Sequence, residues 1–339
     1  MNKLYQVFLV GLAAIVVQTG SSAFAQETFK FVTTVPGQNP MNGAFSAWAE
    51  RVNDRLGDEA QIEVISGSAL AAHGQIIDRI SLGAIDIGFE LQSYFPGQYP
   101  RSDVAGLPGM YEDAVSGSAA LWDLYQSGAL DKEYEGVKIL AMWVFPNADL
   151  LTVDPLEPGR ELKGMRIATN SPMRNQIAEE LGAAPLSFKI TEWYQALQRG
   201  TIDGLIQSTA SVTPFSLQEV VSHVVQYPFG GNAGFVVMSQ EKFDALSDEA
   251  KSVFEEESGR KFSIDLGKTG EGLVAFGRKA IIDLGGESRL PSAEETEMFD
   301  TAVAKVRDEW IEAHPQYKDI VTLFAQHVEK AEAETLADN

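Results

Sequence analysis

The chain contains no cysteine among its 339 residues. Disulfide bonds, thiolate metal sites, cysteine nucleophiles and a lipid-modified N-terminal cysteine are therefore all excluded. Its histidines His73, His223, His314 and His327 are widely separated and form no H-E-x-x-H motif or comparable cluster. The sequence therefore predicts neither a zinc enzyme nor any other metal site.

Nucleotide-binding and hydrolase signatures are also missing. The chain has no P-loop, no G-x-S-x-G turn and no G-x-G-x-x-G loop, and Gly270-Glu271-Gly272 lies in a helical pattern that follows no strand. Pairs of acidic residues are common in so acidic a chain and do not by themselves indicate a catalytic dyad. The sequence predicts no cofactor and no catalytic residue, and we expect no enzymatic activity.

Basic residues are few, with 26 Lys and Arg against 48 Asp and Glu, for a formal net charge of -22. This balance argues against a nucleic-acid partner. One apolar run, at 7–17, follows Lys3 and precedes an A-x-A site at 23–25, which is the pattern of a secretory signal peptide. We expect cleavage near Ala25/Gln26, a periplasmic location, and a mature protein that does not span the membrane.

The stretch 162–208 carries the clearest structural pattern. Strand-like runs at 165–169 and 184–189 are each followed by a helical pattern, and these helical patterns end at Gly182 and Gly200. Alternation of this kind predicts a parallel sheet whose binding residues follow the carboxyl ends of its strands.

Composition shifts around 145–158 and 228–238 indicate that the chain passes from one α/β unit to another and back. Two lobes that exchange the chain more than once imply a hinge. The expected division is a cleaved signal peptide at 1–25, lobe I at 26–149 plus about 235–284, lobe II at 150–234 plus about 285–315, and a C-terminal helix or tail at 316–339.

Three motifs of this stretch carry a family resemblance. E-L-K-G-M-R-I at 161–167, L-G-A-A-P at 181–185, and E-W-Y-Q-A-L-Q-R-G at 192–200 with the following I-D-G resemble the solute-binding proteins of tripartite ATP-independent periplasmic (TRAP) transporters, the dicarboxylate-binding, DctP-like family. Further matches at 82–86 and 242–251 extend the resemblance over nearly all of the mature chain. It implies a two-lobed periplasmic binding protein of two α/β domains, with multiple hinge crossings and long C-terminal helices. The implied partners are a small-molecule solute and TRAP-type membrane permease subunits.

Three positions depart from the family pattern. Most members hold a carboxylate with an arginine where this chain has Ala168, and a second arginine is replaced by Asp149, or by Ala148 if the loop carries a gap. The acid-asparagine pair usual after V-D-G is altered to Ile206-Gln207. A site without both cations would repel a carboxylate, so we expect a small organic amine or amino alcohol, such as ethanolamine.

The residues expected to bind that solute fall into three chemical groups. Two carboxylates accept from an ammonium, aromatic rings offer cation–π faces, and two amides orient a hydroxyl. The predicted ligand-binding residues are Glu90, Asp149, Trp143, Phe145, Trp193, Asn170 and Gln207. The alternative role for Trp143 and Trp193 is burial in the core, because both fall in regular elements.

Other functions remain open from the sequence. The main alternative keeps a carboxylate ligand and holds it with a relocated arginine, either Arg166, Arg174 or Arg101. A further alternative is an extracytoplasmic enzyme, or a ligand-binding protein that serves a periplasmic sensor.

Overall fold

The computed structural model describes residues 27–156 and 162–337. The predicted signal peptide and its cleavage site lie outside the described residues. Within those two ranges, no helix is long and apolar enough to cross a membrane.

The first sheet has five strands in the order β2-β1-β3-β10-β4. β1 is parallel to both β2 and β3, whereas β10 is antiparallel to β3 and β4. β10 is a nearly continuous apolar strand, as expected for a strand covered on both faces. The strands are β1 (Glu27–Thr33), β2 (Ala60–Ser66), β3 (Ile87–Leu91), β4 (Val137–Phe145) and β10 (Asn232–Ser239).

The second sheet has six strands in the order β11-β9-β5-β8-β6-β7. β6 is parallel to β7 and β8, and β9 is parallel to β11, but β5 is antiparallel to both of its neighbours. The strands are β5 (Asp149–Thr152), β6 (Arg166–Thr169), β7 (Ala184–Ser187), β8 (Gly204–Gln207), β9 (His223–Val225) and β11 (Glu287–Arg289).

The predicted parallel pairing within 162–208 is confirmed, but both sheets are mixed. The strands that run antiparallel, β5 and β10, are the two that follow directly after a strand of the other sheet, with no helix between. Neither is entered through a helix that packs back on its own sheet. The connection that forces neighbouring strands to be parallel is therefore missing there.

The helices cover both sheets and join them. The α-helices are α1 (Met41–Leu56), α2 (Ile76–Ser81), α3 (Ala114–Gln126), α4 (Pro172–Glu180), α5 (Trp193–Gln198), α6 (Gln240–Asp244), α7 (Asp248–Glu257), α8 (Gly259–Asp283), α9 (Ala293–Ala313) and α10 (Lys318–Ala337). Short 3-10 helices are η1 (Gln92–Tyr94), η2 (Ser102–Gly106), η3 (Asp131–Glu133), η4 (Ile190–Glu192), η5 (Thr209–Ser211), η6 (Leu217–Glu219) and η7 (Pro315–Tyr317). Side chains cap several amino ends: Ser171 accepts from Arg174 N at the start of α4, and Ser247 from Ala250 N at the start of α7.

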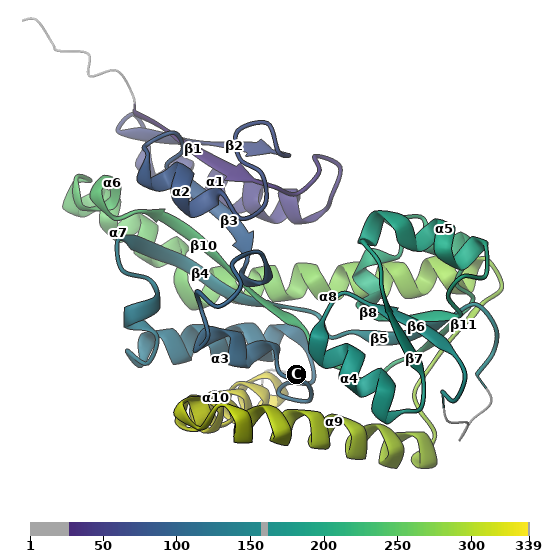
Figure 1. Ribbon diagram of the computed structural model, residues 1–339. Helices are drawn as coiled ribbons and strands as arrows, with labels where there is room; N and C mark the ends of the chain where they lie inside the picture. Colours follow the sequence, from purple (N-terminus) through teal and green to yellow (C-terminus); the bar gives the residue numbers. More distant parts are fainter. Residues whose placement is uncertain (1–26, 157–161, 338–339) are drawn as a thin grey trace, which may run out of the picture.

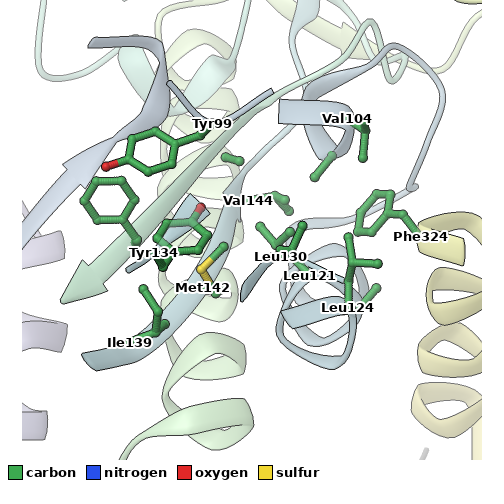
Figure 2. Close-up of a cluster of buried hydrophobic side chains, with 14 of the residues drawn as sticks. Tyr99, Val104, Leu121, Leu124, Leu130, Tyr134, Ile139, Met142, Val144 and Phe324 are labelled. Atoms are coloured by element: carbon green, nitrogen blue, oxygen red, sulfur yellow. The ribbon is translucent and has the colours of Figure 1, made fainter. Parts of the chain in front are cut away.

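We call the first sheet with the helices packed on it lobe I, and the second sheet with its helices lobe II. One face of the lobe I sheet packs against α3, and α10 packs on α3 in turn; Leu121, Met142 and Phe324 belong to one buried cluster there (Figure 2). The C-terminal helix α10 therefore returns to lobe I. α9 instead packs on lobe II, since Phe299 and Val303 share a cluster with Ile206.

α8 runs across both lobes (Figure 1). Its glycines allow close approach along its length: an added Cβ at Gly267 would lie 2.4 Å from the Ala114 carbonyl oxygen of lobe I. One at Gly277 would lie 2.3 Å from the Thr209 carbonyl oxygen of lobe II. The predicted two-lobed α/β fold, with several crossings and long C-terminal helices, is confirmed. The chain passes from the first sheet to the second between Phe145 and Asp149, and returns to the first between Val225 and Asn232. The division into two bodies that move relative to each other stays a prediction.

Candidate functional site

Each sheet has a point at which its strand order reverses, where ligands of α/β proteins usually bind. In lobe I, β1 lies between β2 and β3; in lobe II, β6 lies between β7 and β8. We call the carboxyl ends of β1 and β3 the first switch point, and those of β6 and β8 the second switch point. The carboxyl ends of β1, β2 and β3 face lobe II (Figure 1).

Glu90 occupies the first switch point, with only 1% of its side chain exposed. One carboxylate oxygen accepts from His73 Nδ1 at 3.0 Å and from the Thr34 hydroxyl at 3.4 Å, and the other accepts from the Gly74 N–H at 3.1 Å. The first oxygen also accepts from its neighbour, the Leu91 N–H, at 3.2 Å. These groups use the carboxylate within lobe I, and its contact with a solute stays a prediction.

His73 and Tyr94 form a half-exposed ring pair above this carboxylate. Their ring centroids are 4.0 Å apart with an interplanar angle of 15°. Burial, and then the negative charge of Glu90, raise the pKa of Tyr94. Neither residue was expected at the site, because a lone histidine in a loop and a tyrosine three residues beyond a strand carry no distinctive sequence signal.

At the second switch point the three altered positions share one face of the sheet. Asp149 pairs with Gln207 across β5 and β8, and Ala168 pairs with Leu205 across β6 and β8. Because side chains alternate along a strand, Leu205 and Gln207 point to the same face, so Ala168 and Asp149 do as well. Departures from the family pattern that lie far apart in the sequence therefore lie on one surface.

A cation from α8 reaches Asp149. Both carboxylate oxygens of Asp149 accept from Arg278 Nη2 at 3.1 Å, and one also accepts from the Thr209 hydroxyl. Burial raises the pKa of Asp149, while Arg278 and Thr209 oppose that rise. The pair borders a cavity of about 290 Å³ beside the crossing segments. Arg278 is 129 residues from Asp149, so motif spacing did not predict this contact.

Arg174 lies at the carboxyl end of β6, in the first turn of α4, and is 4% exposed. Its Nη2 donates to Asn170 Oδ1 at 2.7 Å and its Nη1 to the Gly230 carbonyl at 3.0 Å, while Nε has no hydrogen-bond partner. Burial lowers the pKa of Arg174 to about 10. Within 27–156 and 162–337, no carboxylate lies within ion-pair distance of it. Gln207, 6% exposed, likewise has a buried Oε1 without a partner.

The predicted aromatic residues are mostly packed inside the lobes. Trp193 is fully buried in the hydrophobic core of lobe II, and Trp143 is 1% exposed. The Trp143 ring lies 5.7 Å from each of the rings of Phe89 and Phe145. In this conformation neither tryptophan presents a ring face to solvent, while Phe145 is partly exposed. Their cation–π role stays a prediction.

The alternative arginines differ sharply in position. Arg166 donates from both Nε and Nη2 to Asp203, at the amino ends of β6 and β8. Arg101 donates from Nε to the Ala129 carbonyl within lobe I. Of these alternatives, Arg174 is the one at the second switch point. Among the described residues, no group of three or more His, Asp or Glu is arranged to hold a metal ion.

Comparison with known proteins extends the resemblance. The family model for bacterial extracellular solute-binding proteins, family 7, matches residues 31–314. The C4-dicarboxylate-binding periplasmic protein DctP of Rhodobacter capsulatus is 24% identical over 256 residues, which cover 73% of this chain and 75% of that protein.

Solved structures share the fold. A TRAP periplasmic solute-binding protein from Desulfovibrio salexigens, in an open complex, superposes with a TM-score of 0.83 at 23% identity, covering 91% of this chain and 97% of the other. A TRAP solute-binding protein from Rhodoferax ferrireducens, in complex with copurified benzoate, gives a TM-score of 0.80 at 24% identity, covering 91% and 99%. The chain belongs to family 7 of the bacterial extracellular solute-binding proteins, the TRAP transport components that bind small solutes and work with membrane permease subunits rather than as enzymes.

Proposed function

We propose that this chain binds a small organic carboxylate in the periplasm for uptake by its permease, with Arg174 as the charge partner of the solute. The observation that carries this proposal is a guanidinium at the second switch point that is almost fully buried and has no carboxylate within ion-pair distance among the described residues.

An isolated buried charge is unfavourable, and its energy falls when an opposite charge arrives. The two Nη groups of Arg174 now donate to neutral oxygens. A carboxylate is a stronger hydrogen-bond acceptor than an amide or carbonyl oxygen. Because Asn170 is exposed, a solute carboxylate can readily displace its amide oxygen from Arg174. The amino end of α4 adds its partial positive charge at the same place.

The expectation of an amine ligand depended on the absence of both family arginines and on two free acids, Glu90 and Asp149. Arg278 and Thr209 engage Asp149, so it does not offer an unpaired negative charge. Two of the similar proteins are described with a C4-dicarboxylate and with benzoate, and neither description supports an amine. The amine is therefore the competing outcome of the experiment. Gln207 keeps its proposed role, which is to bind a hydroxyl of the solute.

Thermal unfolding of the mature protein with benzoate, D-glucuronate or ethanolamine tests the charge of the solute. A ligand at 100 times its Kd adds about 2.7 kcal/mol to the unfolding free energy. We expect one or more of the acids to raise the Tm of the wild type and ethanolamine to leave it unchanged. Stabilisation by ethanolamine alone would contradict the proposal.

Two variants test Arg174 itself. Arg174→Met should abolish the acid-induced rise in Tm, and Arg174→Lys should weaken it, because lysine keeps the charge but not the two-pronged geometry. Arg166→Met is the control: it removes an arginine of the same lobe, on β6, whose partner is the partly exposed Asp203. If the acid-induced rise in Tm survives in Arg174→Met and disappears in Arg166→Met, then Arg166 and not Arg174 binds the solute, and the proposal is wrong.

We propose in addition that the lobes close around the solute, because a ligand that contacts both lobes stabilises the closed form. Small-angle scattering at saturation should then show a smaller radius of gyration than without solute. An unchanged radius would argue for binding to one lobe only.

A further inference from the structure

We infer that His73 and Tyr94 form a stacking surface for an aromatic ring of the solute, which makes the solute an aromatic monocarboxylate. This inference rests on the proposed function, since it takes the carboxylate to lie near Arg174. It concerns the end of the solute opposite the carboxylate, and it places that end against lobe I.

The ring pair lies at the first switch point. His73 belongs to the loop that follows β2, and Tyr94 ends η1, directly after β3. Glu90, whose hydrogen bond with Thr34 joins the ends of β3 and β1, also accepts from His73. The two segments that carry the rings therefore follow the carboxyl ends of β2 and β3, and these strand ends face lobe II (Figure 1).

The pair is held in place before any solute binds. Glu90 fixes the loop through the His73 ring and the Gly74 N–H. Gly74 has a φ of 77°, and an added Cβ there would lie 3.0 Å from the Tyr94 carbonyl oxygen. The loop thus packs directly on η1, and a rigid surface loses little entropy when a ligand stacks on it.

Exposure distinguishes these rings from their neighbours. Tyr94 is 44% exposed and the His73 side chain 43%, whereas Phe95 and Tyr99, next along the chain, are 4% and 5% exposed. An aromatic pair with free ring area at a binding edge suits a planar apolar partner, because offset stacking adds to simple burial.

The charge beside the rings sets the orientation of the solute. The Glu90 carboxylate accepts from His73 directly, and it disfavours a second negative charge at this end. Arg174 favours a negative charge at the other end. An acid with one carboxylate and one ring satisfies both lobes, whereas a dicarboxylate places a charge close to Glu90.

Titration calorimetry on the mature protein tests this with three probes: benzoate, cyclohexanecarboxylate and succinate. Benzoate and cyclohexanecarboxylate share a carboxylate and a six-membered ring and differ in aromaticity. We expect the wild type to bind benzoate at least tenfold more tightly than either of the others. Equal or weaker binding of benzoate would overturn the inference.

Variants assign the preference to the rings. Tyr94→Leu and His73→Leu should each reduce benzoate affinity about tenfold while changing cyclohexanecarboxylate affinity less than threefold. Tyr94→Phe should keep the preference, since it retains the ring. Phe276→Leu is the matched control, because Phe276 is 60% exposed on α8. An unchanged preference in both leucine variants would overturn the inference.

The outcomes separate this inference from the proposed function. Acid binding that depends on Arg174 but shows no aromatic preference removes the stacking surface alone. Failure of the wild type to bind any of the three acids, together with a response to ethanolamine, removes both.

Discussion

At the first switch point both oxygens of the Glu90 carboxylate accept hydrogen bonds from lobe I, whereas at the second the Arg174 Nε and Gln207 Oε1 atoms are buried without a partner. The first arrangement is complete without solute and fixes a loop. The second is incomplete, and each buried unpartnered group raises the free energy of the solute-free protein. The proposed function accounts for this difference: the Glu90 network supports a preformed surface, and the groups at the second switch point are proposed to gain their partners when the solute binds.

Breaking the Asp149–Arg278 pair should have the largest effect on stability, because Asp149 is a buried charge. It tests whether the other polar groups of lobe II are already paired without solute. Asp149→Leu leaves the Arg278 charge and the Thr209 hydroxyl without their partner. We expect a loss of about 3 kcal/mol in the free energy of unfolding, measured in urea. Asp149→Leu combined with Arg278→Met should lose less than the single variant. A loss below about 1 kcal/mol in Asp149→Leu would class the pair with surface ion pairs.

Glu90→Leu tests the completeness of lobe I. It removes the acceptor of four hydrogen-bond donors. The half-exposed His73 can donate to water instead, but the other three donors reach water less readily. We therefore expect a loss of about 2 kcal/mol in the free energy of unfolding. Glu63→Leu on the exposed side of β2 is the control and should stay within about 0.5 kcal/mol of the wild type. Equal effects of the two changes would remove the contrast between the switch points.

Asp103 sharpens the comparison between the lobes, because it is an acid of lobe I whose charged form is disfavoured by burial. Burial, and then the charge of Glu133, raise the pKa of Asp103 to about 7 from a reference value of 3.8. A raised pKa in the folded state gives a stability contribution that is fully present below about pH 4 and lost as the pH rises through about 7. Asp103→Asn should therefore raise the Tm at pH 8 by about 2–4 °C, corresponding to roughly 1 kcal/mol, and leave it unchanged at pH 4. The exposed Asp58→Asn is the control; a gain of equal size at both pH values would exclude titration as the cause.

Gln207→Met should give the smallest change in stability. It replaces an amide that lacks a partner for its buried oxygen, so the unfolding free energy of the solute-free protein should stay equal or rise by up to about 1 kcal/mol. The Tm increase produced by a hydroxylated acid such as 3-hydroxybenzoate should fall relative to that produced by benzoate. Gln218→Met, which removes another amide with a buried unpartnered oxygen away from the second switch point, is the control. A loss of stability above 1 kcal/mol in Gln207→Met would show that the amide is already paired.

Much of lobe II was predictable because its strands and helices are short, alternate regularly and end at glycines. The sequence also predicted that positions 149, 168 and 207 matter, and the strand register places them on one face. It did not predict the partner of Asp149, because Arg278 lies in a helix whose periodicity identifies its buried side but not its distant contacts. The rings of His73 and Tyr94 were missed for a related reason: their stacking depends on two loops that meet only after the sheet has formed.

The glycines of α8 bear on how such a protein acquires a new specificity. At Gly267 and Gly277 the helix touches the backbone of each lobe, so a methyl group at either position would require the helix to move. A change of side chain at the two switch points does not by itself require a helix to move. Random mutagenesis selected for growth on a new carbon source should therefore recover changes at 73, 94, 170, 174 and 207, and leave both glycines untouched.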